Sequence, residues 1–418
     1  MYKAPRGTSD ILPSEQPYWK YIEQKVISLC QLYGYQFLST PIIEDSRLFT
    51  RKRAGGTDIV DKEMYIFKDR GGQELALKPE GTAPVCRAYL EHGLFNLPQP
   101  VRLYYIGATF RYERPQAGRY RQHHQFGIEA IGDADPALDA EVIEIAQRFL
   151  LSLGIQEFSI QLNSIGCKAC RPQYIEALKR YYSAYEDSLC LDCKTRLEKN
   201  PLRLLDCKNE RCQEIAEKAP KTADFLCREC QTHFHSLQEY LGILDIPFQL
   251  NHRLVRGLDY YTRTVFEIQP RKETPQGVLG GGRYDDLIED LGGKPTPAVG
   301  FAAGIERLLL NLKEQGIALP PPPKGAVFIA FLGKEAKNEA MKLASSLRGD
   351  GIAAIESVGD KSLKAQLKQA NGRDSSYTII IGKEELETQN AVLRNMKSGE
   401  QKTIPLSQLA AVLKQTRL

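Results

Sequence analysis

The segment LVRGLDYYTRTVFE, residues 254–267, combines side chains that can bind an anion and a polar ring. Arg256 carries a permanently charged, planar guanidinium, which binds carboxylate and phosphate groups through paired hydrogen bonds. Tyr260 and Tyr261 add two adjacent phenolic hydroxyl groups. The pattern predicts a strand that holds both kinds of ligand group, and ordinary strand aromatics are the alternative.

A predicted hairpin supplies a second group of charged side chains. Residues 101–113 and 122–131 are typical of two strands around the polar turn RPQAGRYR, and period-two alternation places Arg111 and Glu113 on one face. On the return strand three residues share a face: Gln125, Gly127 and Glu129. Gly127 is expected to let a ligand approach the backbone closely. Arginines in the turn, Arg119 among them, suit phosphate groups, whereas a solvated charged hairpin is the alternative.

Two predicted junctions between a strand and a helix carry further polar residues. In KPEGTA, residues 78–83, Glu80 could bind an ammonium group, while Thr82 could simply cap the following helix. In GFAAGIERL, residues 300–308, Arg307 could stack on a base or bind a phosphate. The alternative for the second junction is a tightly packed strand and helix with a surface arginine.

Eight of the ten cysteines lie in one region of the chain. They form four pairs: Cys167 and Cys170, Cys190 and Cys193, Cys207 and Cys212, Cys227 and Cys230. Pairs of this spacing are the usual form of structural zinc sites, so eight thiols would suit two four-cysteine sites. His233 or His235 could replace one ligand. Free thiols buried in a helical lobe are the alternative.

The elements that must position these residues change character along the chain. Strand patterns dominate up to about residue 163 and resume at 247, while the cysteine-rich stretch between them is helical and charged. This stretch therefore resembles an insertion, 164–246, into an antiparallel-sheet domain made of 1–163 and 247–318. A proline-rich linker, 319–325, precedes alternating strands and helices at 326–418, which predict a separate α/β domain.

Composition excludes several classes of protein. The chain has 418 residues, 42% of them hydrophobic and 26% charged, which is ordinary for a globular protein. A net charge of +4 excludes a polybasic binder but permits a local basic face. The sequence contains no run of about 18 apolar residues and no leader with an apolar core, so a cytoplasmic protein without a membrane partner is expected.

The order of these segments resembles a known enzyme class. FRYE, residues 110–113, and GIER, residues 304–307, resemble motifs 2 and 3 of the class II aminoacyl-tRNA synthetases. Residues 254–267 and GGGRYD, residues 280–285, resemble the two histidine-specific motifs of the histidyl-tRNA synthetase family. RGTSDILP, residues 6–13, matches the N-terminus of that family, and the resemblance spans essentially the whole chain.

The resemblance implies an α+β fold, with a class II antiparallel-sheet catalytic domain, a helical insertion and a C-terminal α/β anticodon-binding domain. It implies that L-histidine is joined to ATP as histidyl-adenylate and then transferred to tRNA(His). Magnesium should accompany the ATP phosphates. The family is a homodimer, and the region around Pro41 resembles the class motif 1 interface. The resemblance lends no support to zinc.

The resemblance also assigns roles to residues. Arg111 and Arg256 resemble the catalytic arginines, Arg256 taking a place that other class II enzymes give to a metal ion. The implied ATP-binding residues are Arg111, Glu113, Arg119, Phe126 and Arg307. The implied histidine-binding residues are Glu80, Gly81, Thr82, Gln125, Glu129, Tyr260, Tyr261 and Tyr284. Within this set Glu129 and Tyr261 are expected to bond the two imidazole nitrogens.

Two other functions are weighed against this one. A non-catalytic relative, such as the regulatory subunit of ATP phosphoribosyltransferase, would usually lose the C-terminal domain and the catalytic arginines. A zinc-dependent nucleic-acid-binding protein would have no reason to keep Glu80, Gln125, Glu129 and Tyr261 together. Histidine-dependent exchange of pyrophosphate into ATP separates the three functions, because only the synthetase catalyses it.

Overall fold

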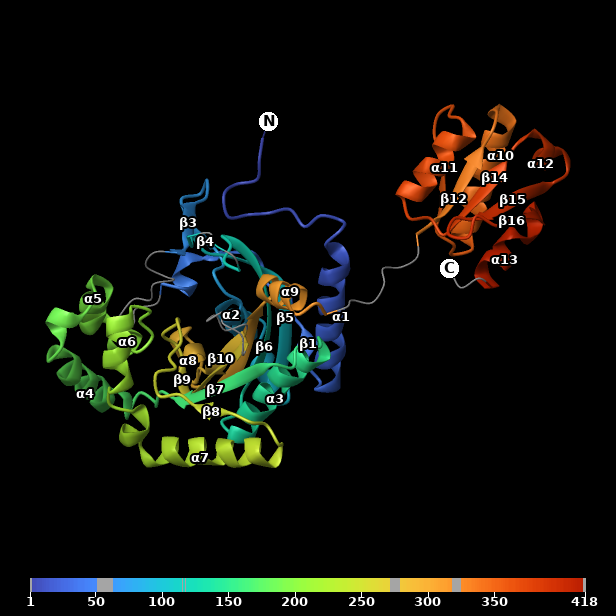
Figure 1. Ribbon diagram of the computed structural model, residues 1–418. Coiled ribbons are helices and arrows are strands. Elements are labelled where there is room, and N and C mark those ends of the chain that lie inside the picture. Colours follow the sequence, from blue (N-terminus) through green and yellow to red (C-terminus); the bar gives the residue numbers. More distant parts are fainter. Residues whose placement is uncertain are drawn as a thin grey trace. The chain divides into compact units, whose positions relative to one another are not determined.

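The computed structural model describes residues 2–50, 63–114, 116, 118–270, 279–317 and 325–415. The chain divides into two compact units, Met1–Leu319 and Pro320–Leu418. Figure 1 shows a large sheet with its helices in the first unit and a smaller sheet with its own helices in the second. The predicted linker 319–325 lies outside the described residues except for Gly325.

The first unit is built on an eight-stranded sheet that is mainly antiparallel. Its strands, in spatial order, are β1 (Gln36–Phe37), β5 (Val101–Phe110), β6 (Gln122–Ile131), β11 (Ala298–Gly304), β10 (Leu279–Arg283), β9 (Thr262–Pro270), β7 (Phe158–Ser164) and β8 (Gln249–Leu250). Only the outer pairs, β1 with β5 and β7 with β8, are parallel. Strands far apart in sequence therefore meet at the centre of the sheet, where β6 pairs with β11.

Helices cover one face of this sheet and form the main hydrophobic core with it. They are α1 (Gln16–Leu32), α3 (Pro136–Ser152), α7 (Arg228–Ile243) and α9 (Ile305–Glu314). The apolar spacing of α1 buries Ile22 and Val26, as the helical pattern predicts. Asp135 caps α3 through its carboxylate, which accepts a hydrogen bond from the Ala137 N–H. The alternation of β6 sends Phe126 and Ile128 into this core.

The cysteine-rich stretch leaves the sheet after β7 and returns at β8, which is the neighbouring strand. It contains α4 (Arg171–Ser183), α5 (Leu191–Lys199) and α6 (Glu210–Glu217), followed by α7. These first three helices share a second core with the opposite face of the sheet, whereas Leu237 and Leu241 of α7 pack into the main core. The last helix of the predicted insertion is thus part of the catalytic core.

A small sheet flanks the large one. It consists of β2 (Ile43–Asp45), β4 (Glu74–Leu77) and β3 (Tyr65–Lys68), all antiparallel. Helix α2 (Thr82–Glu91) follows β4 and contacts the short helix α8 (Leu287–Asp290). The KPEGTA segment is the turn between β4 and α2, which is the strand–helix junction that its sequence predicts.

The second unit has a five-stranded mixed sheet in the order β13-β12-β14-β15-β16. Its elements are β12 (Val327–Phe331), α10 (Lys334–Gly349), β13 (Ala354–Glu356), α11 (Leu363–Gly372), β14 (Tyr377–Ile381), α12 (Lys383–Glu387), β15 (Asn390–Asn395), β16 (Gln401–Pro405) and α13 (Leu409–Gln415). The first three strands are parallel and the last two antiparallel. Among the described residues of either unit, no helix is both long and apolar enough to cross a membrane.

Two expectations about strands are wrong in detail. Residues 254–261 form an irregular loop with a bend and a turn rather than a strand, and β9 begins only at Thr262. The first hairpin strand ends at Phe110 instead of 113, because the Tyr112 N–H bonds the Glu63 carbonyl outside the hairpin. Arg111, Arg256 and Tyr261 consequently project from loops at the strand ends, where the backbone need not satisfy the ladder of a sheet.

Candidate active site

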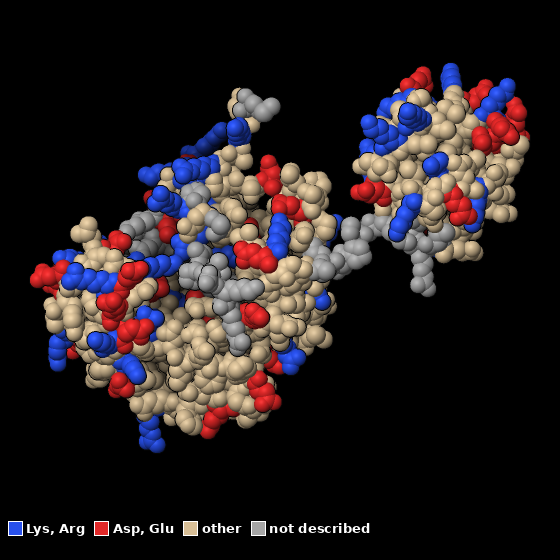
Figure 2. Space-filling model, in the orientation of Figure 1, with Lys and Arg blue, Asp and Glu red and all other residues tan. Residues whose placement is uncertain are grey.

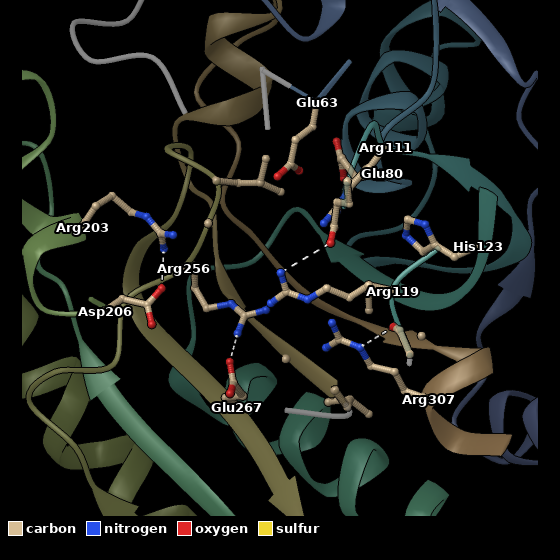
Figure 3. Close-up of a pocket in the computed structure, with 18 of the residues that line it drawn as sticks. Glu63, Glu80, Arg111, Arg119, His123, Arg203, Asp206, Arg256, Glu267 and Arg307 are labelled. Carbon is tan, nitrogen blue, oxygen red and sulfur yellow. Dashed lines mark hydrogen bonds and ion pairs between the residues drawn. The ribbon is translucent and has the colours of Figure 1, made fainter. Parts of the chain in front are cut away.

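A cleft of about 940 Å³ opens on the face of the large sheet that the main core does not cover. It brings together ten of the residues predicted from the sequence: Glu80, Thr82, Arg111, Glu113, Arg119, Gln125, Arg256, Tyr260, Tyr261 and Arg307. They come from the β4–α2 turn, the β5–β6 hairpin, the loop before β9 and the start of α9. Figure 3 shows Arg111, Arg119, Arg256 and Arg307 around one space.

Three arginines form the most cationic part of the cleft. The Arg119 guanidinium lies 3.6 Å from the Glu113 carboxylate, and Arg307 donates from Nε to the Gly118 carbonyl at 3.1 Å. Arg111 donates from Nε to the Pro79 carbonyl at 2.8 Å. Burial together with the charge of neighbouring Arg119 lowers the pKa of Arg307, because like charges close together disfavour the ionised form. A polyanion would relieve that repulsion.

Arg256 is held in place by an acidic partner. Its Nη1 donates to the Glu267 carboxylate of β9 at 2.6 Å, as Figure 3 shows. Burial acts to lower the pKa of Arg256, but Glu267 together with Tyr261 and Tyr260 outweighs this effect, and the pKa is raised. A methyl group on Gly280 of β10 would lie 2.5 Å from Arg256 Nη1, so the guanidinium lies flat against the sheet. Its position is fixed from two sides, which favours a defined contact with a reacting group.

Glu80, rather than Thr82, caps α2. Its carboxylate accepts hydrogen bonds from the N–H groups of Thr82 at 2.6 Å and Ala83 at 2.8 Å. The Thr82 hydroxyl instead donates to Glu129 at 2.7 Å. Glu80 therefore has the capping role that was considered for Thr82, and its side chain also lines the cleft, where it could bind an ammonium group.

Glu129 lies beneath the floor of the cleft and is fully buried. Its two carboxylate oxygens accept hydrogen bonds from the hydroxyls of Thr82 at 2.7 Å and Tyr284 at 2.5 Å. Burial nevertheless raises the pKa of Glu129 to about 8. The predicted wall residue Tyr284 therefore supports Glu129 from behind, and neither residue lines the cleft.

Three more residues that were predicted to contact a ligand do not line the cleft. Phe126 does not face the cleft, since its ring packs in the main core 4.9 Å from the Phe149 ring and 5.5 Å from the Phe301 ring. Gly127 does not leave space for a ligand, because a methyl group there would lie 2.3 Å from Tyr105, whose ring fills that space. Gly81 has the same neighbour, at 2.2 Å, so its backbone supports Tyr105 and does not line the cleft.

Several cleft residues were missed by the sequence prediction. His123, the second residue of β6, lines the cleft. Burial together with nearby Arg111 and Arg307 lowers the pKa of His123 to about 3. A neutral aromatic ring therefore lies among the arginines. Strand alternation could have found it, since His123 shares its face with Gln125.

The insertion also contributes basic residues to the cleft. Arg196 of α5, Arg203 and Lys208 line it opposite the hairpin. Arg203 pairs with Asp206 at 2.8 Å. Nothing in the local pattern of these residues distinguishes them from other charged helix positions, and only the packing of the insertion against the sheet brings them to the cleft.

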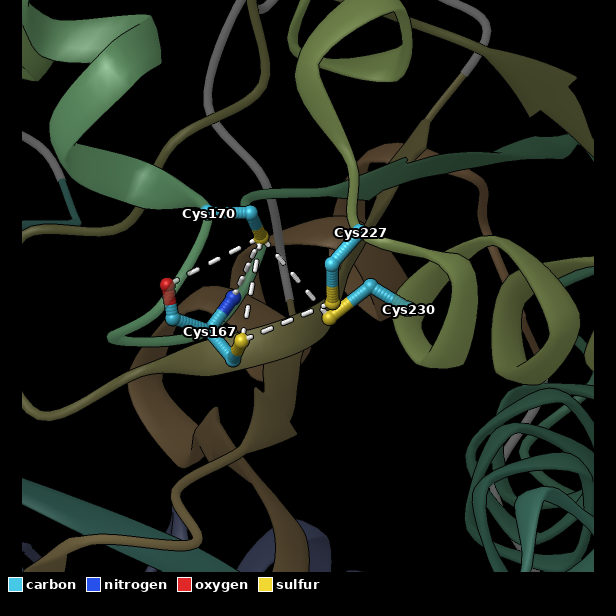
Figure 4. A group of neighbouring side chains, drawn as sticks. All are labelled: Cys167, Cys170, Cys227 and Cys230. Carbon is cyan, nitrogen blue, oxygen red and sulfur yellow. Dashed lines mark hydrogen bonds between the residues drawn. The ribbon is translucent and has the colours of Figure 1, made fainter.

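The eight paired cysteines form two groups. The sheet-side group consists of Cys167, Cys170, Cys227 and Cys230, and Figure 4 shows these four side chains turned toward one another. The lobe group consists of Cys190, Cys193, Cys207 and Cys212. All four Sγ atoms of each group lie within 4.8 Å of one another. Neither histidine considered as a ligand belongs to a group, since His233 lies 3.6 Å from Asp139 and His235 3.4 Å from Glu239.

The distances between sulfur atoms have a simple geometric meaning. In the sheet-side group Cys167 lies 3.7 Å from Cys170 and 3.9 Å from Cys227, and in the lobe group Cys190 lies 3.8 Å from Cys207. A zinc–sulfur bond of about 2.3 Å in a tetrahedron places two ligand sulfurs about 3.8 Å apart, whereas a disulfide joins them at about 2.0 Å. The sulfur positions therefore fit the edges of a tetrahedral thiolate site.

Gly300 of β11 permits the buried position of Glu129. A methyl group on Gly300 would lie 2.0 Å from Glu129 Oε2 and 2.3 Å from the Ile128 carbonyl. We expect Gly300→Ala to displace Glu129 and to lower the free energy of unfolding by about 2 kcal/mol or more, because neither neighbour can yield without a backbone shift. Denaturant titration checks this.

The matched control is Gly242→Ala in α7, where a methyl group would meet nothing within 4 Å. Alanine favours a helix over glycine by about 0.8–1 kcal/mol, so this variant should be at least as stable as the wild type. Equal stability of the two variants would contradict the crowding at Gly300.

A largely antiparallel sheet with arginines from its hairpin and from the β11–α9 junction in one cleft, in a chain that also has a separate α/β unit, defines a class II aminoacyl-tRNA synthetase. The histidyl-tRNA synthetase family matches residues 7–170 and 190–308, and the anticodon-binding domain family matches residues 326–416. The chain belongs to the histidyl-tRNA synthetase family.

Relatives cover the whole chain. It is 60% identical to a histidine–tRNA ligase of Dehalococcoides mccartyi over 99% of both chains, and 48% identical to one of Desulforamulus reducens over 98% of both. The apo histidyl-tRNA synthetase of S. aureus is similar in structure, with a TM-score of 0.83 and 39% identity over 99% of this chain and 100% of that one. An ATP phosphoribosyltransferase regulatory subunit/histidyl-tRNA synthetase from Bacillus halodurans, at 24% identity and a TM-score of 0.66, shares the fold.

Proposed function

We propose that this protein joins L-histidine to ATP as histidyl-adenylate and then transfers histidine to tRNA(His). Family membership over the full chain supports the overall reaction. The observation that carries the residue assignment is the convergence of Arg111, Arg256 and Arg307 from three separate segments on one cleft. A regulatory relative without catalysis would have no use for this cluster of cations.

The first step needs positioning and charge stabilisation more than proton transfer. A carboxylate oxygen of histidine forms a bond to the α-phosphorus of ATP, and the bond from that phosphorus to the pyrophosphate oxygen breaks. No base is needed, because the attacking carboxylate is already ionised. We assign Arg111 and Arg256 to the α-phosphate and the carboxylate, since planar guanidinium groups can contact both anions as negative charge builds.

The remaining arginines suit the tail of ATP. Arg119 and Arg307 are the proposed partners of the β- and γ-phosphates, and ATP is expected as its magnesium complex. Glu113 orients Arg119 through their ion pair. The family resemblance placed Phe126 near adenine. We assign this role to His123 instead, because the His123 ring lines the cleft and could stack on the adenine ring.

Histidine itself is assigned to the deeper part of the cleft. Its ammonium group suits Glu80, Thr82 and Gln125, whose polar atoms line the cleft. Its imidazole suits Tyr261 and Glu129, with Tyr260, Tyr284 and Gly81 shaping the surroundings. Because Glu129 is bonded to Thr82 and Tyr284, histidine must reach it through a rearrangement of those hydroxyls.

The tRNA is the proposed partner of both units. Residues 326–418 are assigned to the anticodon, following their match to the anticodon-binding domain family. Lys and Arg side chains gather over β3 and β4 of the first unit in Figure 2, which suits the phosphates of an acceptor arm. The insertion 164–246 is assigned to the same arm because Arg196 and Lys208 line the cleft.

We also propose a homodimer in the cytoplasm. Near Pro41 the apolar residues Phe37, Ile42 and Ile43 are 56%, 47% and 48% exposed, which is costly on a free surface. Sedimentation equilibrium should give twice the chain mass, and a monomer at micromolar concentration would refute the assignment.

The reaction is tested by exchange of labelled pyrophosphate into ATP. We expect exchange with L-histidine and none above background with the other amino acids or with histidinol, which lacks the carboxylate. Charging of tRNA(His) transcript should follow the same specificity. Absence of histidine-dependent exchange in protein that remains folded by circular dichroism would overturn the proposed function.

Zinc is the proposed occupant of the two cysteine groups, because their sulfur spacing fits a tetrahedral thiolate site and thiolates are zinc's preferred structural ligands. We expect elemental analysis to find two zinc ions per chain. Cys86→Ala should keep both, since Cys86 is buried outside either group. Zinc-free protein in which all ten thiols titrate after unfolding would contradict the assignment.

A further inference from the structure

The sheet-side cysteine group joins two segments that are remote in sequence. Cys167 and Cys170 lie in the loop after β7, and Cys227 and Cys230 begin α7, 60 residues later. The loop is a knuckle of the kind that wraps a metal: Gly166 has a φ of +70°, and the Cys167 N–H donates to the Cys170 sulfur at 3.2 Å. A metal at this group would therefore fix both segments at once.

The same loop pairs with the backbone just after Tyr261. The Ile165 N–H donates to the Arg263 carbonyl, and the Arg263 N–H donates to the Gly166 carbonyl, both at 2.8 Å. Arg263 has a φ of +47°, which is uncommon for a residue other than glycine and persists only where the surroundings hold it. The strained backbone at Arg263, the second residue of β9, is thus held by the loop that carries Cys167.

Arg171 completes the connection. It follows Cys170 directly, and its Nη2 donates to the Tyr261 carbonyl at 2.6 Å and to the Gly166 carbonyl at 3.0 Å. The side chain of Tyr261 lines the cleft, while its carbonyl is held by a residue whose backbone position depends on the knuckle.

We propose that the sheet-side site is a metal clamp on the histidine pocket, with Arg171 as the positioning residue that transmits metal binding to Tyr261. The clamp rests on the proposed function, since it assigns Tyr261 to histidine and zinc to the cysteines. Loss of the metal frees residues 165–171, releases the Tyr261 carbonyl and lets the strained backbone at Arg263 relax. The lobe site holds α5 and α6, and its Cys190 and Cys207 line the side of the cleft that the insertion forms. Because histidine is assigned to residues outside the insertion, we expect loss of the lobe site to leave histidine affinity unchanged.

The two groups provide a matched pair of variants. Cys227 and Cys190 are each the first cysteine of a C-x2-C pair, and each precedes a helix with nearly the same backbone geometry, φ −66° with ψ of 162° and 161°. Both are partly exposed, so serine is tolerated sterically at either position. Cys227→Ser removes a ligand of the clamp, and Cys190→Ser removes the corresponding ligand of the lobe site.

Zinc content and histidine affinity are measured in parallel, by elemental analysis and by isothermal titration with histidine alone. We expect each variant to lose one zinc ion per chain. Cys227→Ser should raise the Kd for histidine about tenfold or more and leave the Kd for ATP within twofold. Cys190→Ser should leave the histidine Kd within twofold. Equal histidine affinity in the two variants, or zinc-free wild-type protein, overturns the clamp.

Arg171 variants test the transmission without touching a ligand. Arg171→Ala should retain two zinc ions and raise the histidine KM in pyrophosphate exchange about tenfold, with little change in kcat at saturating histidine. Arg171→Lys, which can reach one of the two carbonyls, should give an intermediate KM. Unchanged KM in Arg171→Ala refutes the clamp, and it does so without bearing on the reaction itself, because wild-type exchange with histidine reports that separately.

Discussion

Replacing Arg256 by histidine should lower the rate of histidine-dependent pyrophosphate exchange by about 10²–10³-fold, the usual effect of removing one preorganised donor to a developing anion. The guanidinium is held by Glu267 at 2.6 Å and lies against Gly280, so a shorter imidazole cannot reach the same position. Histidine binding should be largely retained, because Tyr261 and Glu80 are unchanged. Exchange kinetics and isothermal titration with histidine check the two parts.

Arg253→His is the matched control for this experiment. Arg253 lies three residues earlier on the same loop and pairs with Glu217 at 3.1 Å, away from the residues that line the cleft. Its exchange rate should stay within about twofold of the wild type. If Arg256→His retained more than a tenth of the wild-type rate, the assignment of Arg256 to the reacting phosphate would be wrong.

Glu129→Gln should weaken histidine binding about 30–100-fold, the cost of about 2–3 kcal/mol for a mismatched buried hydrogen bond. The Glu129 side chain lies buried beneath the floor of the cleft and accepts hydrogen bonds from the hydroxyls of Thr82 and Tyr284. Glutamine keeps the shape but replaces one acceptor by a donor. Exposed Glu157 provides the control, and Glu157→Gln should bind histidine normally.

The same substitution should change how stability depends on pH. Burial raises the pKa of Glu129 from 4.5 to about 8, so the folded protein binds this proton more tightly than the unfolded chain does. The contribution of Glu129 to stability is therefore full below pH 4.5 and is lost as pH rises through 8. Between pH 5 and 8.5, the wild type should lose about 2–4 kcal/mol more than Glu129→Gln.

Denaturant titrations at several pH values without histidine measure this difference. We expect Glu129→Gln to be the more stable protein at pH 8.5 while it binds histidine less well. Parallel pH profiles for the two proteins would show that Glu129 does not carry the raised pKa.

Most of the helices and strands that position the site could be predicted from the periodicity of apolar residues and from the order of the family motifs. Helix α1 and the β5–β6 hairpin are strongly periodic, and ten predicted residues line one cleft because motif order in a known family fixes their strands. The two-group arrangement of the cysteines could not be read from spacing, since four pairs allow several combinations. The fold decides it, by bringing the loop after β7 next to the start of α7.

The errors have local physical causes. Phe126 was misplaced because the family pattern gave a residue type near adenine, whereas strand alternation turns this ring into the core and His123 toward the cleft. Gly127 was expected to admit a ligand, but the glycine makes room for Tyr105 from the neighbouring strand. A single sequence shows that a glycine leaves space beside the backbone, but it does not show which neighbouring side chain or ligand fills that space.

The packing of α7 limits how the enzyme can be recombined. Leu237 and Leu241 of α7 are fully buried in the main core, so a chimera that exchanged residues 164–246 as a cassette would open a hole beneath α3. Crossover points that keep α7 with its original sheet, just before Cys227, would preserve that contact. Such a hybrid would, however, take Cys167 and Cys170 from one parent and Cys227 and Cys230 from the other. A functional hybrid would therefore require parents whose cysteine pairs can replace one another.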